Sequence, residues 1–196
     1  KRQEAAISSA ILPTSMAGLD IVPSTVDLSS ADIELIKTPN HSTALSRALV
    51  EDKTLAGNYD FIFVDCPPSL SLLTINAMVV SDSVLIPLQS EFFALEGLSQ
   101  LMLSVREVRK SVNTGLRFEG IVLTLFDRRN NLSQQVEKDA RENLGELVFK
   151  TVIPRNVRVS EAPSHSVPVL IYEPRSRGAQ AYRRLAKEFL KNNKSI

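Results

Sequence analysis

The chain has 196 residues, of which 43% are hydrophobic and 23% charged, as in an ordinary globular protein with a sizeable core. No apolar run approaches the roughly eighteen residues of a membrane span, and the first residues lack the character of a signal peptide. The one cysteine, Cys66, excludes an internal disulfide and a cysteine cage for a metal, so we expect a reducing, cytoplasmic compartment.

The net charge of +1 conceals an uneven distribution along the chain. Residues 1–100 carry five Lys and Arg against twelve Asp and Glu, whereas residues 101–196 carry eighteen against ten. This asymmetry has two interpretations: the second half contacts an anionic partner, or opposite charges meet on the folded surface.

Hydrophobic periodicity and breaker residues predict strands that alternate with helices. In chain order we expect a strand at 19–23, helices at 31–36 and 42–57, a strand that ends at Asp65, a helix at 72–78, a strand at 83–88, a long helix at 95–112, a strand at 120–126, a helix at 133–144, a strand at 148–153 and a closing amphipathic helix at 176–191. This order indicates βαβ units and an α/β fold with a mostly parallel sheet.

The most informative stretch is an apolar run, 61–64, that leads directly into Asp65 and then into Pro67 and Pro68. A continuous apolar run is typical of a central strand buried on both faces, and ligands in such sheets bind at the carboxyl ends of the strands. A carboxylate at that end is a hard oxygen ligand for Mg²⁺, as in a Walker B element. The alternative is an Asp that caps the turn after the strand.

A phosphate-binding loop is absent from the printed sequence. Such a loop needs clustered glycines, whose backbone N–H groups cradle the phosphates, and a Lys that reaches toward them. The seven glycines are widely spaced and none precedes a Lys.

Six segments in the same order as in a known family extend over nearly the whole chain. They are Tyr59-Asp60 with 65–70 (DCPPSL), 73–77 (LTINA), 91–97 (EFFALEG), 152–158 (VIPRNVR), 160–164 (SEAPS) and 172–178 (YEPRSRG). With these segments the chain resembles the ParA/Soj-type chromosome- and plasmid-partitioning ATPases, in the deviant Walker A class that includes MinD and the nitrogenase iron protein.

The resemblance implies a three-layer α/β fold of the P-loop NTPase type. We expect residues 1–196 to form a single ParA-type domain, truncated at the N-terminus, that lacks the first strand, the P-loop and switch I. The family's catalytic lysines and its water-positioning Asp have no counterparts here. We therefore assign no catalytic residue, and whether this chain is itself an ATPase stays open.

The resemblance assigns candidate binding residues for ATP and Mg²⁺. Asp65 is the expected Mg²⁺ ligand, and Asp127, Pro154, Arg155 and Asn156 are the expected nucleotide-binding residues on the base side. Asn and Asp suit hydrogen bonds to base edges, and proline offers an apolar face. The alternative for 154–156 is an ordinary turn after a strand.

The resemblance also implies partners. Family members form ATP-dependent homodimers, bind DNA without sequence preference at the nucleoid, and are stimulated by a ParB-type partner. Arg129 and Arg158 match arginines used for DNA, and an arginine fork suits phosphate oxygens. The basic residues of 172–196 bind the same partner or form a solvated face.

Two other functions remain as alternatives. A MinD-like positioning ATPase would lay its closing amphipathic helix on a membrane, whereas we expect that helix to pack on the sheet, with no membrane contact. A chain without a phosphate loop also fits a nucleotide-independent DNA-binding or regulatory remnant. An iron–sulfur reductase is excluded, because one cysteine supplies too few thiolates even in a dimer.

Overall fold

The computed structural model describes residues 6–52, 55, 57–67 and 69–193. The chain divides into two compact units, Lys1–Asp82 with Ser104–Leu116 and Ser83–Leu103 with Arg117–Ile196. In the described part of the chain, every helix is too short or too polar to cross a membrane.

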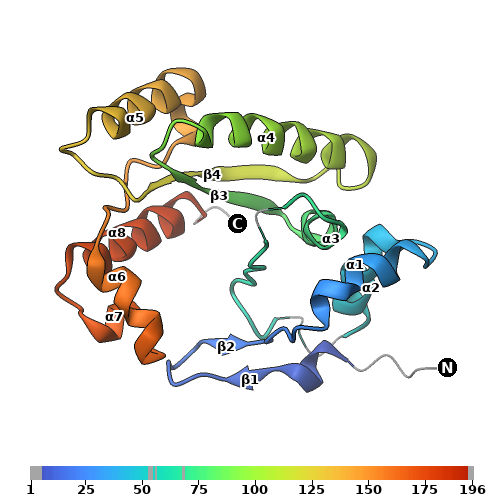
Figure 1. The fold of residues 1–196 in the computed structure, drawn as a ribbon. Coiled ribbons are helices and arrows are strands. Elements are labelled where there is room, and N and C mark those ends of the chain that lie inside the picture. The colour runs from blue at the N-terminus through green and yellow to red at the C-terminus, as the bar shows by residue number, and fades with distance from the viewer. Residues whose placement is uncertain (1–5, 53–54, 56, 68, 194–196) are drawn as a thin grey trace. The chain divides into compact units, whose positions relative to one another are not determined.

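The first unit is mainly helical (Figure 1). It contains the 3₁₀ helix η1 (Ile7–Ala10), the antiparallel pair β1 (Leu12–Pro13) and β2 (Asp20–Ile21), α1 (Leu28–Ile36), η2 (His41–Thr43), α2 (Ala44–Glu51), α3 (Leu72–Val80) and the end of α4 (Ala94–Ser111). Each helix expected here is present, although α2 ends at Glu51, short of the predicted end at residue 57.

A buried amide, that of Asn76, joins the helices of this unit. Asn76 is 3% exposed, and its Nδ2 donates to the carbonyls of His41 (2.8 Å) and Leu72 (2.9 Å). Its Oδ1 accepts the backbone N–H of Leu45 at 3.2 Å. Because every bond is made to backbone, this side chain fixes η2 and the start of α2 against α3.

The prediction of a buried strand that ends at Asp65 is wrong for this structure. Residues 61–67 have no assigned strand, and the side chains of the apolar run are 40–70% exposed: Phe61, Ile62, Phe63 and Val64. A central strand is buried only where it lies between paired strands under helices. The sheets formed by the described residues, β1–β2 and β3–β4, do not include this segment.

The second unit is built on a parallel βαβ element, as predicted. Strands β3 (Ser83–Gln89) and β4 (Arg117–Thr124) pair in parallel, from Ser83↔Arg117 to Gln89↔Thr124, and α4 connects them. One face of the pair packs against α4 and α5 (Asn131–Leu144) through the cluster of Ile86, Leu88, Leu98, Ile121, Leu123, Ala140 and Val148. Helices α4 and α5 therefore cover one face of the sheet of this unit.

The closing helix α8 (Arg177–Asn192) covers the opposite face of this sheet. Its Ala181, Leu185 and Phe189 pack with Val122 and with residues of the segment that follows η3 (Gly145–Leu147). Ser176 caps the helix, because its Oγ accepts the N–H of Ala179 at 3.1 Å. Much of the apolar face of α8 thus packs on the sheet, as expected, although Tyr182 and Leu190 remain exposed.

Residues 148–153 were predicted as a strand, but the structure replaces that strand with two isolated bridges, Ile121↔Val148 and Phe126↔Pro154. The N–H of Phe149 donates to the carbonyl of Ile121 (2.9 Å), and the N–H of Ile153 donates to that of Leu123 (2.8 Å). From Phe149 to Ile153 the chain thus advances four residues, whereas β4 advances only two, from Ile121 to Leu123. The two extra residues form a bulge, which interrupts a regular ladder.

Short helices complete the second unit between the bulge and α8 (Figure 1). They are α6 (Val157–Glu161), η4 (Ala162–His165) and α7 (Val169–Tyr172).

Candidate functional site

The candidate site of the second unit begins where β4 ends. Leu125 has φ 52°, a left-handed conformation that costs a non-glycine residue about 1–2 kcal/mol. Phe126, which is 6% exposed, then anchors the chain, and the polar residues Asp127 and Arg129 follow at the surface. A strained residue beside a strand end is common at ligand sites, because surrounding contacts hold the chain in a fixed position there.

The 154–156 segment lies directly beside this strand end. The N–H of Phe126 donates to the carbonyl of Ile153 at 3.1 Å, and the N–H of Arg155 donates to that of Phe126 at 3.0 Å. The Arg155 guanidinium also reaches Glu91, in the loop after β3, at 3.6 Å. The predicted base-side residues Asp127, Pro154, Arg155 and Asn156 therefore belong to one local site, built from three loops.

The carboxylate of Asp127 is already engaged. It accepts the backbone N–H of Arg129 at 3.0 Å, and Nε of the same residue at 3.3 Å. The hydrogen bonds and charge of Arg129, with the charge of Arg155, lower the pKa of Asp127 below its ordinary value. The structure thus pairs Asp127, which is predicted to bind the base, with Arg129, which is predicted to bind DNA.

Asn156 carries an unpartnered polar atom. Its Oδ1 is buried and accepts no hydrogen bond from the described residues. This oxygen lies beside Gly178 of α8, which Val159 of α6 also approaches. A Cβ atom on Gly178 would overlap Val159 and would lie 3.2 Å from Asn156 Oδ1. A buried amide oxygen without a donor suits a ligand that brings an N–H group, such as the amino group of a nucleobase.

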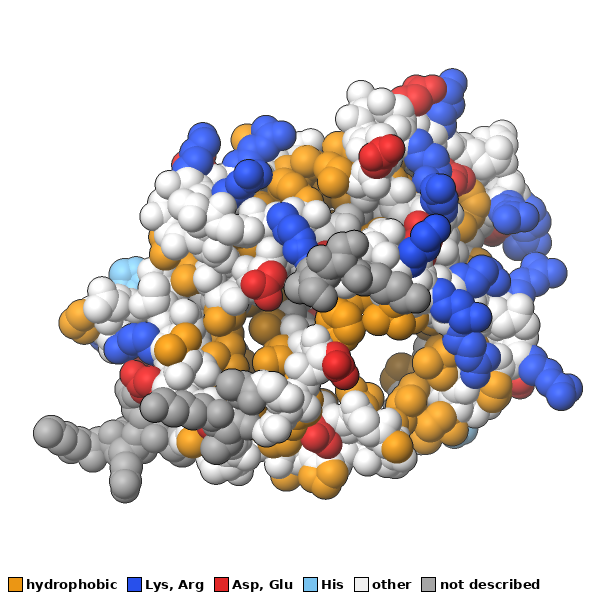
Figure 2. Space-filling view, turned by 180° about the vertical axis from the view of Figure 1, so that it is seen from behind, with side chains coloured by type: hydrophobic (Ala, Val, Ile, Leu, Met, Phe, Trp, Pro, Cys, Tyr) orange, Lys and Arg blue, Asp and Glu red, His pale blue; other side chains and the backbone are white. Residues whose placement is uncertain are grey.

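Arg158 is held by an acidic neighbour. Its guanidinium donates to Glu161 Oε2 at 2.8 Å, and the Tyr172 hydroxyl lies 3.4 Å from the same oxygen. The Tyr172 ring stacks on His165 at 4.7 Å. Arg158 nevertheless remains 52% exposed and Arg129 91% exposed at the side chain, so both are accessible to phosphate oxygens. Figure 2 shows many Lys and Arg side chains that protrude from the surface.

Asp65 belongs to the first unit, where it follows the exposed 61–64 run. The described residues contain no cluster of three His, Cys, Asp or Glu that could hold a metal ion. Mg²⁺ bound with a nucleotide needs only one or two carboxylates, because phosphate oxygens and waters complete its shell. The role of Asp65 as a ligand of nucleotide-bound Mg²⁺ stays a prediction.

Three polar groups of the site were not predicted from the sequence: the carboxylates of Glu91 and Glu161 and the hydroxyl of Tyr172. Glu161 lies three residues from Arg158, a helical spacing that favours an ion pair and offered a signal. Glu91 contacts Arg155 from 64 residues away, and no local pattern predicts such a pair.

Comparison with known proteins places this chain in a family. A family model described as "AAA domain" matches residues 2–118. The Bacillus subtilis (strain 168) sporulation initiation inhibitor protein Soj is 52% identical over 182 residues, which are 93% of this chain and 71% of that protein. The Caulobacter vibrioides chromosome partitioning protein ParA is 51% identical over 187 residues, 95% of this chain and 70% of that protein.

A solved structure has the same fold. Cobyrinic acid a,c-diamide synthase from Mycobacterium smegmatis, crystallised with an ATP analog and magnesium, superposes with a TM-score of 0.79 at 32% identity, over 97% of this chain and 69% of that one.

The fold is therefore an α/β fold of the P-loop NTPase class, and the predicted fold class is confirmed. Within that class the identities are high and extend over most of the sequence. The chain belongs to the ParA/Soj family of chromosome-partitioning ATPases.

Proposed function

We propose that this chain acts in chromosome or plasmid partitioning as a ParA-type protein that binds ATP with Mg²⁺. The observation that carries the proposal is the site at the end of β4, where Asp127 and 154–156 converge and Asn156 presents a buried oxygen without a donor. Identity above 50% to proteins named for chromosome partitioning and sporulation control supports the biological role.

In this proposal each predicted residue has a separate role. Asp65 is a ligand of nucleotide-bound Mg²⁺, and the bound ion would offset the negative charge of the phosphates. Asn156 accepts a hydrogen bond from the base, and Pro154 offers its ring as an apolar surface. Arg155 remains fixed beside the base by its ion pair with Glu91.

We further propose that Arg129 and Arg158 contact DNA without sequence preference, on an ATP-dependent homodimer at the nucleoid of the cytoplasm. Their exposed guanidinium groups support this role, since phosphate contacts supply most of the affinity for non-specific DNA. A ParB-type protein is the proposed stimulating partner, from the family alone.

A second candidate is nucleotide-independent DNA binding, supported by the exposed guanidinium groups of Arg129 and Arg158. The packing of α8 onto the sheet argues against the third candidate, a MinD-like membrane ATPase.

Calorimetry with ATP and Mg²⁺ distinguishes the first two candidates. The first predicts binding that weakens at least tenfold in Asn156→Ala and in Asp65→Ala. Binding of DNA by a chain that gives no heat with ATP would support the second candidate and would contradict the first for this 196-residue chain.

A further inference from the structure

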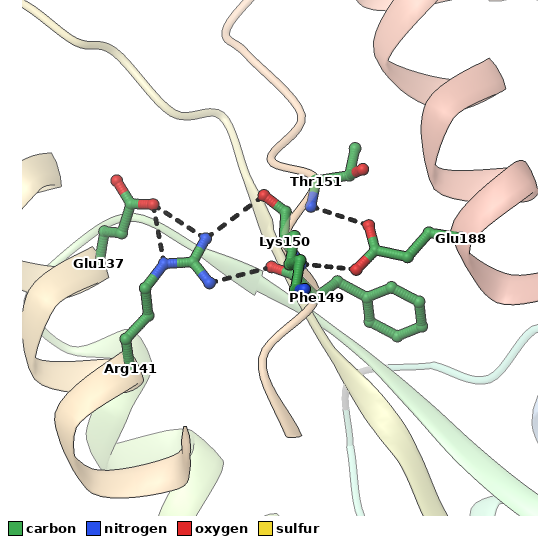
Figure 3. A network of polar contacts seen from close by, with 6 residues as sticks. All are labelled: Glu137, Arg141, Phe149, Lys150, Thr151 and Glu188. Carbon is green, nitrogen blue, oxygen red and sulfur yellow. Dashed lines mark hydrogen bonds and ion pairs between the residues drawn. The ribbon is translucent and has the colours of Figure 1, made fainter. Parts of the chain in front are cut away.

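The bulge between the two isolated bridges is held by side chains instead of by the sheet. The N–H groups of Lys150 and Thr151 donate to the two carboxylate oxygens of Glu188, at 2.7 and 2.9 Å. On the other side, the guanidinium of Arg141 donates to the carbonyls of Phe149 (3.2 Å) and Lys150 (3.5 Å). Figure 3 shows these contacts on both sides of the segment.

Arg141 is in turn fixed by Glu137, one helical turn earlier on α5, with Nη2 to Oε1 at 2.9 Å and Nε to Oε1 at 3.0 Å. The backbone of 149–151 is thus hydrogen-bonded by the Arg141 cation from α5 and by the Glu188 anion from α8 (Figure 3). We call Arg141 and Glu188, with the backbone that they bind, the bulge clamp.

The clamp replaces the hydrogen bonds that the bulge removes from the ladder. Between the bonds at Phe149 and Ile153 the backbone has left β4, so its polar groups need other partners. Bonds to charged side chains are stronger than those between neutral groups, and the two oxygens of one carboxylate fix two successive N–H groups at once. The position of residues 149–151 is therefore set by α5 and α8.

The same stretch leads into the candidate nucleotide loop within three residues. Ile153 returns to β4, Arg155 bonds to Phe126, and Asn156 then packs at Gly178 of α8. Glu188 and Gly178 belong to the same helix, so α8 contacts this stretch before and after Pro154. A change at the clamp should therefore be transmitted to 154–156 over a few bonds.

We propose that Glu188 and Arg141 are positioning residues for the nucleotide site, which set the place of 154–156 against Asp127 and thereby the choice of base. The proposed effect on base choice rests on the proposed function. The proposed effect on the position of 154–156 rests only on the contacts of Glu188 and Arg141.

The effect of the bulge clamp on the position of 154–156 is tested by amide hydrogen exchange on the whole chain without ligand. In Glu188→Gln one carboxylate oxygen is replaced by an amide group that cannot accept, so one of the two N–H bonds is lost. We expect exchange to rise about tenfold or more at Lys150 and Thr151, the change that matches the loss of one hydrogen bond to a charged group. We also expect a rise at Arg155 and Phe126, with the amides of Ile121 and Leu123 unchanged.

Two further variants distinguish a specific effect on the position of 154–156 from a general loss of stability. Arg141→Lys should raise exchange at Arg155 and Phe126 in the same way, from the side of α5. Glu142→Gln, whose carboxylate lies at the surface 3.8 Å from Lys138, is the matched control and should leave the loop unchanged. A rise confined to Lys150 and Thr151, or one spread equally over the core amides, would overturn the proposal.

The role of the bulge clamp in base choice is tested by calorimetry with ATP and with GTP, each with Mg²⁺. We expect Glu188→Gln to reduce the ratio of the two affinities at least threefold, whereas Glu142→Gln keeps it. An unchanged ratio in a variant whose loop exchanges faster would overturn the role in base choice. Absence of nucleotide binding by the unaltered chain would contradict the proposed function, and the exchange result would still decide whether the clamp positions the loop.

Discussion

Asp127 and Arg129 form an ion pair in which Asp127 Oδ1 accepts both the backbone N–H and Nε of Arg129, at 3.0 and 3.3 Å. The turn after β4 therefore closes on itself and presents the guanidinium outward, where 91% of the Arg129 side chain is exposed. Arg158 is also paired with a carboxylate, that of Glu161, through its side chain alone. Each arginine proposed for DNA thus has a carboxylate that limits where its charge can move.

Replacement of Arg129 or Arg158 by Ala should weaken binding to any duplex about equally, whatever its sequence. Each loss removes about one phosphate contact, so the slope of log K against log salt should become shallower by about one. Fluorescence anisotropy with two unrelated duplexes over a salt series measures both quantities. Lys110→Ala is the control, because Lys110 is exposed and paired with Glu107 on α4. An equal loss in this control would argue against a defined DNA surface.

Gly178→Ala should destabilise the protein by about 1–3 kcal/mol, since the added methyl group would overlap Val159 where α6 meets α8. Gly97→Ala is a matched control, as its helical site in α4 has no atom within 4 Å of the new Cβ. That change should be neutral or stabilise by up to about 1 kcal/mol. Urea denaturation measures both variants, and equal stability of the two would contradict the close approach at Gly178.

Stability should fall in acid partly because of Glu188. Burial alone would raise the pKa of Glu188, but the hydrogen bonds from Thr151 and Lys150 outweigh it and the net pKa lies below the ordinary value. A carboxyl group with a lowered pKa in the folded state contributes stability above its unfolded pKa and loses it as pH falls through the folded one. Denaturation between pH 7 and pH 3 should therefore show a shallower decline in Glu188→Gln. Identical slopes would indicate that the clamp has no electrostatic role.

Loss of the Asn76 side chain should disrupt the first unit. Asn76→Ala leaves the N–H of Leu45 and the carbonyl of His41 without their partner in a site that is 3% exposed. Each buried polar group left unpaired costs about 1–3 kcal/mol. Thermal unfolding should show a clear loss, whereas Asn113→Ala, which removes two donor bonds to the carbonyls of Met78 and Ser81, should cost less. A near-zero effect of Asn76→Ala would mean that water replaces the amide.

The exposed run at 61–64 should favour association between molecules. Ile62 is 58% exposed in an apolar segment without assigned secondary structure, and such segments are prone to pair with other chains. Light scattering at micromolar concentration should show self-association that Ile62→Lys reduces. Ile33→Lys, at a site 65% exposed on α1, is the control and should have less effect. A monodisperse monomer before any substitution would contradict the prediction.

The sequence was sufficient to predict the βαβ element, because its strands and the helix between them have clear periodicity and their contacts are close along the chain. Residues 61–64 have the same apolar character as β4, but a strand also needs neighbours, which composition does not supply. The strand predicted at 148–153 failed for another reason. Its bulge depends on Glu188, about 38 residues away, and no local pattern reports such a contact.

The candidate site was predicted in part. Asp127 and 154–156 were selected from resemblance and lie together, although their roles in binding remain proposals. Glu91, the partner of Arg155, was missed because an exposed Glu far away in the sequence has no feature that separates an ion pair from a solvated charge. Glu161, the partner of Arg158, was missed although its helical spacing offered a signal. The unpartnered oxygen of Asn156 is likewise a property of packing at Gly178 and is visible only in three dimensions.

The two extra residues opposite β4 also bear on how this stretch can vary in length. A regular parallel strand tolerates the insertion or deletion of one residue poorly, since the change turns every following side chain to the opposite face. A surplus of two preserves the alternation, so Phe149 and Ile153 both face α8 although the chain between them has left the sheet. Removal of Lys150 and Thr151 together would keep that alternation, whereas removal of either one alone would reverse it from Val152 onward. At this site, chain length should change by two residues more readily than by one.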